Sequence, residues 1–224
     1  MLEDRYRRTA RLLDEIRIEA EATAYHTGRA AFAERVMQAL ARVPRDEFVP
    51  TEHGYQAWAN HPLPIGRGQT ISQPFIVALM TDLIDPEPGD VVLEIGTGSG
   101  YQAAVLAGLV KQVYTMDIIG TLATEAAHRL SRLGYDNVEV RSGNGRRGWP
   151  EHAPYDAILV AAAAHSVPPA LVGQLKPGGR LVIPVGEPGE SQELLLLSKD
   201  ALGRVHEHNV LPVVFVPLTG TAGG

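Results

Sequence analysis

The residues best placed to do chemistry lie in residues 91–100, where an aliphatic run leads into alternating glycines. Residues 91–95 are β-branched or aliphatic apart from Glu94, which is typical of a buried strand. Gly96, Gly98 and Gly100 follow, and the residues after them favour a helix. Because glycine has no Cβ, the backbone can turn sharply here and let a ligand come close. A strand that passes through glycines into a helix N-terminus predicts a nucleotide-binding turn.

The charge beside this turn indicates the kind of ligand. Dinucleotide-binding turns have the spacing G-x-G-x-x-G and face a pyrophosphate, whereas here Glu94 stands just before glycines at every second position. A carboxylate repels phosphate and attracts cations, so we predict S-adenosylmethionine, which carries an ammonium and a sulfonium but no phosphate. Asp117, at the end of the next predicted strand, is placed to accept hydrogen bonds from ribose hydroxyls. The alternative is a tight strand–helix turn that binds nothing.

The elements around this turn alternate between strand and helix, which predicts an α/β, Rossmann-like fold with a mostly parallel sheet and helices on both faces. Two final apolar runs, separated by a short polar stretch, are expected to pair antiparallel. The carboxyl ends of parallel strands meet at one edge, so the glycine turn, Asp117 and Asn144-Gly145 are expected to converge there. The expected strands are residues 91–95, 113–117, 138–141, 156–161, 179–184, 194–197 and 210–216, and the expected helices are 100–109, 119–133 and 167–175.

The N-terminal part has a helical pattern. Residues 4–24 are charged with a thin apolar stripe, and residues 30–42 place Phe32, Val36, Met37 and Leu40 on one side. We expect residues 1–45 to form a helical extension packed on a core at residues 46–224, within a single domain.

The segment between the N-terminal helices and the sheet has no clear period over residues 46–71. A stretch this long without secondary structure tends to be functional in a compact protein, so we expect residues 60–74 to form a substrate loop. Ser72 is expected to begin and cap the helix that follows, with Pro74 in the first turn.

Composition excludes several classes of protein. The chain has 224 residues, no cysteine and a net charge of −6, with its basic residues scattered. The absence of cysteine excludes disulfides, thiolate catalysis and zinc–sulfur sites, and the charge argues against a nucleic-acid groove. His206 and His208 share a predicted strand face without a third ligand, so we expect no metal site. No apolar run approaches about 20 residues and no secretory signal is visible, so we expect a cytoplasmic protein with neither a membrane nor a nucleic acid as partner.

The residues at the end of the fourth strand exclude some classes of methyl acceptor. Adenine N6-methyltransferases place an Asn/Asp-Pro-Pro-aromatic motif there to hold a flipped base, and this chain has the run 161–166 instead, four alanines followed by His165 and Ser166. Cytosine C5 enzymes need a cysteine. The remaining acceptors are oxygen, or nitrogen in other settings.

Several motifs resemble the protein-L-isoaspartate O-methyltransferase family over about residues 30 to 219. The Gln-Thr-Ile-Ser run within residues 63–74 is specific to that family, whereas the glycine turn within residues 93–102 is shared by most methyltransferases of this fold. The other matching motifs are residues 43–49, 175–182 and 215–219. The resemblance implies an S-adenosylmethionine-dependent methyltransferase fold and transfer of a methyl group to the free α-carboxylate of L-isoaspartyl residues in damaged proteins and peptides. The ester then closes to a succinimide, and S-adenosylhomocysteine is the other product.

The resemblance also implies roles for individual residues. Ser72 takes the active-site serine position with Thr70 beside it. Where Asp117 stands the family often has Glu, and where Asn144 stands it usually has Asp; we expect the shorter acid to reach the ribose and the amide oxygen to accept from the adenine amino group. The implied cofactor positions are Gln69, Ile71, Glu94, Gly96, Thr97, Gly98, Gly100, Gln102, Asp117, Ile118, Asn144 and Gly145, and the implied peptide-binding positions are Val216, Pro217, Leu218 and Thr219.

Three other functions fit parts of the sequence. One is an Asp-directed O-methyltransferase that tailors a dedicated peptide in natural-product biosynthesis. The second is a nicotinamide-dependent oxidoreductase, against which Glu94 and the glycine spacing count. The third is a binding module that kept the fold without activity. We expect a monomer.

Overall fold

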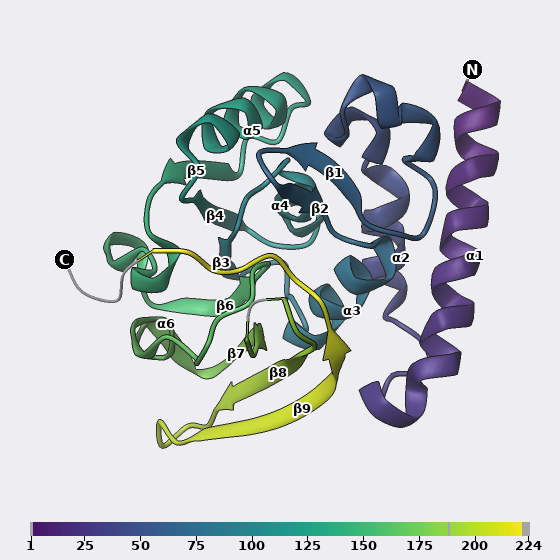
Figure 1. Ribbon diagram of the computed structural model, residues 1–224. Coiled ribbons are helices and arrows are strands. Elements are labelled where there is room, and N and C mark those ends of the chain that lie inside the picture. Colours follow the sequence, from purple (N-terminus) through teal and green to yellow (C-terminus); the bar gives the residue numbers. More distant parts are fainter. Residues whose placement is uncertain (1, 188, 221–224) are drawn as a thin grey trace.

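A computed structural model of the chain describes residues 2–187 and 189–220 (Figure 1). Its centre is a seven-stranded sheet with the order β5-β4-β3-β6-β7-β8-β9. Strands β3 to β7 run parallel, β8 is antiparallel to β7, and β9 is antiparallel to β8. The predicted mostly parallel sheet with an antiparallel C-terminal pair is therefore confirmed. The strands are β3 (Val91–Ile95), β4 (Gln112–Asp117), β5 (Val138–Ser142), β6 (Tyr155–Val160), β7 (Leu175–Val185), β8 (Gln192–Lys199) and β9 (Val205–Val213).

Helices cover both faces of this sheet, as the alternating pattern predicted. Successive residues of a strand point to opposite faces, and in β3 Val92 joins one apolar cluster while Leu93 and Ile95 join the other. The first cluster includes side chains of α3 (Pro74–Ile84), α4 (Tyr101–Ala107) and α5 (Gly120–Arg132). The second includes Leu171 of α6 (Pro169–Gln174) and Trp149.

The N-terminal segment packs on the first face. It consists of α1 (Leu2–Thr27), which stands along the right-hand side of the molecule in Figure 1, and α2 (Glu34–Arg42). Leu12, Ile16 and Ala20 of α1 are at most 5% exposed and belong to the same cluster as α2 and α3.

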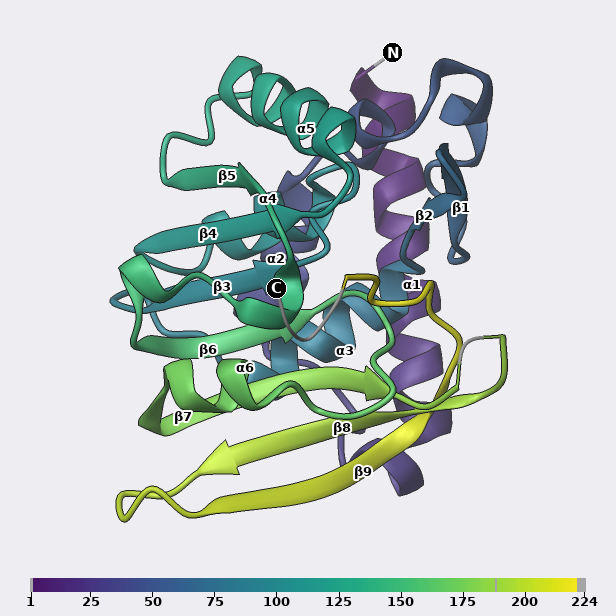
Figure 2. The same cartoon turned by 60° about the vertical axis from the view of Figure 1, so that its left-hand side comes forward.

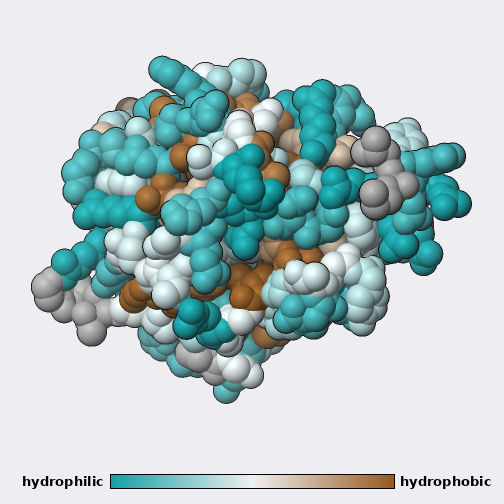
Figure 3. All heavy atoms as spheres, turned by 90° about the horizontal axis from the view of Figure 1, so that it is seen from above, coloured by the Kyte–Doolittle hydropathy of each residue, from teal (hydrophilic) through white to brown (hydrophobic). Residues whose placement is uncertain are grey.

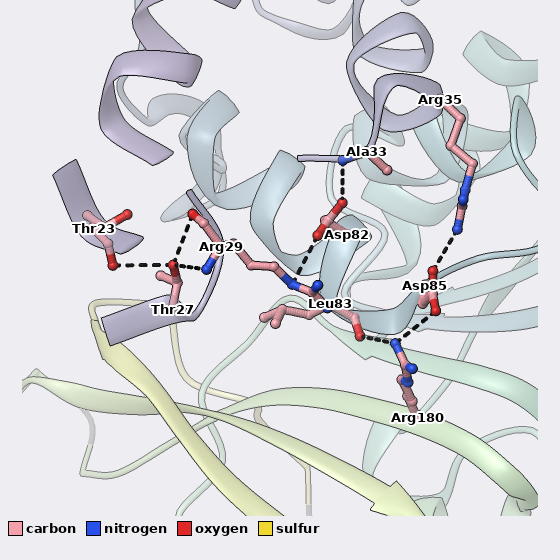
Figure 4. A network of polar contacts seen from close by, with 9 residues as sticks. All are labelled: Thr23, Thr27, Arg29, Ala33, Arg35, Asp82, Leu83, Asp85 and Arg180. Atoms are coloured by element: carbon pink, nitrogen blue, oxygen red, sulfur yellow. Dashed lines mark hydrogen bonds and ion pairs between the residues drawn. The ribbon is translucent and has the colours of Figure 1, made fainter. Parts of the chain in front are cut away.

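Polar contacts hold the two N-terminal helices to the end of α3 (Figure 4). The Asp82 carboxylate accepts a hydrogen bond from the Ala33 N–H at 2.7 Å and pairs with Arg29 at 3.2 Å. Asp85 pairs with Arg35 and with Arg180 of β7. The expected helix 30–42 begins only at residue 34, because the backbone before it is extended and delivers an N–H to Asp82.

The segment 46–71 has more structure than its sequence suggested. It contains the short 3-10 helices η1 (Arg45–Phe48) and η2 (Thr51–Gln56) and a hairpin of β1 (Leu63–Gly66) and β2 (Gln69–Ile71). Strands of four and three residues are too short to show a hydrophobic period, so neither strand could be predicted from the sequence.

The expectation that Ser72 begins and caps α3 was wrong. The helix starts at Pro74, Gln73 is the N-cap residue, and its side chain makes no capping bond. The Asn60 side chain caps the helix instead, since its Oδ1 accepts a hydrogen bond from the Phe75 N–H at 2.9 Å. A cap delivered across the fold leaves no local sequence signature.

Arg45 holds the beginning and the end of this segment together. Its side chain is 2% exposed, and burial lowers the pKa of its guanidinium to about 10. The guanidinium donates to carbonyl oxygens on both sides of the hairpin, namely those of Ala57, Ala59, His61 and Ser72, at 2.7 to 3.4 Å.

Within residues 2–187 and 189–220, no helix has the length and apolar character needed to cross a membrane. Figure 3 shows the molecule from above the view of Figure 1, with apolar side chains reaching this face in separate patches between hydrophilic ones.

Replacing Arg45 with Met is expected to lower the free energy of unfolding by about 2–4 kcal/mol, because four carbonyl oxygens lose a buried charged donor. Urea denaturation measures this. The matched control is Arg42→Met on the exposed end of α2, which should change stability by less than about 0.5 kcal/mol. Equal effects of the two changes would show that Arg45 is not an anchor.

Candidate active site

Three cavities meet at the carboxyl ends of the parallel strands, and Thr70 and Ala161 line all of them. The large cavity, of about 400 Å³, lies between the 62–76 segment and residues 211–216. The Asp117 cavity, of about 60 Å³, lies beside the ends of β3 and β4. The Glu94 cavity, of about 30 Å³, lies under the glycine turn. Thr70 and Ala161 therefore stand where a small ligand in the narrow cavities would meet one in the large cavity.

Glu94 is the most unusual group of the site. Its side chain is fully buried, and its Oε2 accepts a hydrogen bond from the Thr115 hydroxyl at 2.5 Å. Its Oε1 is buried without any hydrogen-bond partner among the described residues. Burial raises the pKa of Glu94 to about 8; the bond from Thr115 opposes the rise and the nearby charge of Asp117 adds to it. The protein alone therefore does not stabilise the ionised form of Glu94, whereas a ligand that brings positive charge to this oxygen would.

The glycine turn and Asp117 are built as one unit. Gly96 and Gly98 have φ of +93° and +52°, a conformation that favours glycine. The Gly98 N–H donates to Asp117 Oδ2 and the Ile119 N–H to Oδ1, both at 2.8 Å. A carboxylate accepts about four hydrogen bonds, so each oxygen keeps capacity toward the Asp117 cavity. Asp117 thus fixes the turn and still offers acceptors to a pair of hydroxyls.

The residues that follow β5 shape the site through their packing. Asn144 caps the short helix η3 (Gly145–Arg147) by accepting from the Arg146 N–H at 3.1 Å. A Cβ at Gly145 would lie 2.2 Å from Ile95 Cγ2, so only glycine fits there. Gly145 lines the Asp117 cavity, whereas Asn144 lines none of the three cavities.

The last described segment closes the site. The chain leaves β9 at residue 213, three residues earlier than expected, and crosses the strand ends (Figures 1 and 2). It pairs with Ala163, whose N–H donates to the Val216 carbonyl at 2.8 Å and whose carbonyl accepts from the Leu218 N–H at 2.7 Å. Val216 lines the large cavity and the Asp117 cavity, while Pro217, Leu218 and Thr219 line only the latter. Residues 221–224 lie outside the described part of the chain.

Ser72 lies between the large cavity and the Glu94 cavity and lines both. Its carbonyl is held by Arg45 at 3.1 Å, while its hydroxyl has no hydrogen-bond partner among the described residues. The hydroxyl is therefore free to donate to a ligand. Thr70 stands beside it on β2.

The other expected cofactor residues divide between the two narrow cavities. Gly100 is the exception, because it lines neither cavity. Its φ is +89°, and a Cβ at this position would lie 3.1 Å from Leu130 Cδ1, so a glycine here allows α4 to pack closely on α5. Gln69 and Ile118 line the Asp117 cavity, and Ile71, Thr97 and Gln102 line the Glu94 cavity.

Sequence reasoning missed several residues of the site. The sequence placed the run 161–166 at this edge of the sheet without assigning Ala161 a role, and Ala161 lines all three cavities. Thr115 bonds Glu94 from the neighbouring strand, a pairing that follows from register alone. Glu19, from α1, lines the large cavity and had no signal at all.

His206 and His208 both lie on β9, as expected, and His206 is 3.3 Å from Asp200. In the described part of the chain, no three His, Asp or Glu side chains are grouped so that they could hold a metal ion.

Comparison with known proteins bears on what the site does. The model of the family described as protein-L-isoaspartate(D-aspartate) O-methyltransferase matches residues 23–223. The chain belongs to this family. The motifs that suggested it in the sequence are thereby confirmed.

Individual relatives agree with this assignment. Protein-L-isoaspartate O-methyltransferase 2 of Polaromonas sp. is 57% identical over 209 residues, which are 93% of this chain and 99% of the relative. A solved protein-L-isoaspartate O-methyltransferase superposes with a TM-score of 0.79 at 27% identity, over 94% of this chain and 67% of that one. A Plasmodium falciparum structure carrying the same enzyme name, in complex with S-adenosyl-L-homocysteine, has a TM-score of 0.77 over 93% of this chain and 96% of that one; at 24% identity it shows the fold alone.

Glu94 should leave a signature in the pH dependence of stability. Its pKa rises from an ordinary 4.5 to about 8 on folding, so the folded chain holds an extra proton between these values and stability falls as pH rises through them. Glu94→Gln removes this contribution. Between pH 5 and 8 the variant should lose less stability than the parent protein, by on the order of 3 kcal/mol.

Urea denaturation at a series of pH values measures the difference. Glu125→Gln, on the exposed face of α5, is the control and should keep the slope of the parent protein. A Glu94→Gln variant with that same slope would show that Glu94 is already ionised in the folded protein.

Proposed function

We propose that this protein is a protein-L-isoaspartate O-methyltransferase that moves the methyl group of S-adenosylmethionine to the free α-carboxylate of L-isoaspartyl residues in damaged proteins and peptides. The observation that carries the proposal is that a buried oxygen of Glu94 and the Ser72 hydroxyl, neither of which has a hydrogen-bond partner among the described residues, belong to residues that line the same cavity. The Glu94 carboxyl group can bind a cation, and the Ser72 hydroxyl can donate a hydrogen bond to an anion. The methyl donor is a cation and the methyl acceptor, a carboxylate, is an anion.

The residues around the narrow cavities fit this cofactor. Glu94 would face its positive charge, Asp117 would accept from the ribose hydroxyls, and Gly96 and Gly98 let it approach the backbone. Ile118, 43% exposed beside the Asp117 cavity, offers an apolar surface for the adenine. When bound, the cofactor supplies a methyl group on a sulfonium, a good leaving group. The transfer calls for no metal.

The protein's own contribution is to position the acceptor. A carboxylate is already ionised at neutral pH, so no general base is needed. The Ser72 hydroxyl donates to the substrate carboxylate, and Thr70, where the three cavities meet, lies beside the path of transfer. Val216 belongs to the wall between the peptide and the cofactor. Alignment of this kind supplies about 7–11 kcal/mol. The ester then closes to a succinimide without further help.

The substrates are isoaspartyl proteins and peptides, which the large cavity admits as an extended segment. The Asp-directed tailoring activity is less favoured, because a relative named for isoaspartate matches 93% of the chain. That the protein works as a monomer in the cytoplasm stays a prediction from the sequence.

The experiment that tests this function is methyl transfer from labelled S-adenosylmethionine to an isoaspartyl peptide and to its Asp twin. We expect methylation of the first and at least about a hundredfold less of the second, because only the isoaspartyl linkage presents a free α-carboxylate. Equal rates on both peptides would favour the tailoring activity, and no transfer to either would overturn the proposal.

Ser72→Ala should lower kcat on the isoaspartyl peptide about 10- to 100-fold, since the carboxylate loses the donor that orients it. The Kd of S-adenosylhomocysteine, measured by calorimetry, should stay within about twofold. Ser131→Ala on α5, at an exposed position, is the control. Full turnover by Ser72→Ala would remove Ser72 from the mechanism.

A further inference from the structure

The N-terminal helix reaches into the large cavity through one side chain. Glu19 lies in the second half of α1, between the buried Ile16 and Ala20, and is itself partly buried. It is the one charged residue in the cavity lining given by the described residues. The match to the family model begins at residue 23, four residues after Glu19.

Glu19 joins the two ends of the substrate loop 60–74. Its Oε2 accepts from Asn60 Nδ2 at 2.7 Å, at the first residue of that loop. Both of its oxygens also accept from Gln73 Nε2, at 3.0 and 3.1 Å, near the last. The network continues into α3, because Asn60 Oδ1 accepts the Phe75 N–H at 2.9 Å.

Two anchors therefore hold the loop from opposite sides. Arg45, which is buried, binds carbonyl oxygens that include those of His61 and Ser72. Glu19, on the cavity side, binds the Asn60 and Gln73 side chains. Ser72 lies directly before Gln73 and is fixed between the anchors through its neighbour and its own carbonyl. The side-chain partners of Glu19 among the described residues are these two neutral amides.

We infer that the N-terminal helix is part of the peptide-binding site and that Glu19 is a positioning residue, which sets the place of the Ser72 hydroxyl by tying the ends of its loop together. The expected effect of Glu19 on turnover rests on the proposed function, whereas its expected effect on the position of the loop does not. Without Glu19 the Asn60 and Gln73 amides lose their common acceptor, the cap on Phe75 loosens, and the Ser72 hydroxyl no longer meets the substrate carboxylate in one place. Displacements of about 1 Å at a reacting group can cost a hundredfold in rate.

The test compares Glu19→Ala with Glu21→Ala, an exposed position two residues along the same helix. We expect Glu19→Ala to lower kcat/KM for an isoaspartyl peptide about tenfold, with the Kd of S-adenosylhomocysteine within about twofold of the parent protein. Glu19→Gln, which keeps one carbonyl acceptor, should recover part of the loss. Glu21→Ala should match the parent protein. Parallel losses of turnover and of cofactor affinity in Glu19→Ala would mean general destabilisation and would overturn the inference.

A double-mutant cycle with Gln73→Ala tests whether Glu19 affects turnover through its hydrogen bonds to the loop. If Glu19 acts through the loop ends, Glu19→Ala combined with Gln73→Ala should lose little more than the worse single variant. Multiplied losses would place Glu19 in an independent role and overturn the inference.

Amide hydrogen exchange separates this inference from the proposed function. The Phe75 N–H should exchange at least about tenfold faster in Glu19→Ala than in Glu21→Ala, whether or not any peptide is methylated. If the parent protein methylates no isoaspartyl peptide but this exchange difference is found, the proposed function fails and the anchoring of the loop stands. If the exchange rates are equal, the anchoring itself is contradicted.

Discussion

The structure depends most on a carboxyl group buried without its full set of partners. Glu94 lies on the interior strand β3 and is fully buried; one of its oxygens accepts a hydrogen bond from Thr115, and the other has no hydrogen-bond partner among the described residues. An isolated ionised carboxylate in such a place is costly, and the group avoids that cost by holding its proton, as its pKa of about 8 indicates. A ligand that brings a positive charge makes the ionised form favourable. The affinity for a cationic cofactor is thus prepared by the fold.

The rest of the site follows from the geometry of a parallel sheet. The ends of β3, β4 and β6 bring the glycine turn, Asp117 and Ala161 to one edge, although these residues lie far apart in sequence. Two further segments cover this edge, the hairpin with its anchors and the final segment paired with Ala163. The cofactor region is therefore built from the sheet, while the peptide region is built from connections and from the N-terminal helix.

That division explains what the sequence could predict. The strands, their direction and the grouping of Glu94, Asp117 and Gly145 followed from hydrophobic pattern and from the rule that parallel strands end together, and the structure has all of these. The cap of α3 could not be predicted, because Asn60 delivers it from 15 residues away. Glu19 could not be predicted either, because on a charged helix nothing distinguishes one glutamate from its neighbours. Contacts between residues far apart in the chain produce no periodic pattern in the sequence.

The most direct test is the proton balance of cofactor binding. Calorimetry of S-adenosylhomocysteine binding at pH 7, in buffers with different heats of ionisation, reports how many protons are released. If Glu94 holds a proton with a pKa of about 8 and releases it to the buffer when the ligand's ammonium group pairs with the carboxylate, close to one proton, about 0.9, should be released at pH 7, and none should be released from Glu94→Gln. Binding heats that do not depend on the buffer would contradict the account, because Glu94 would then already be ionised or would not face the ligand's charge.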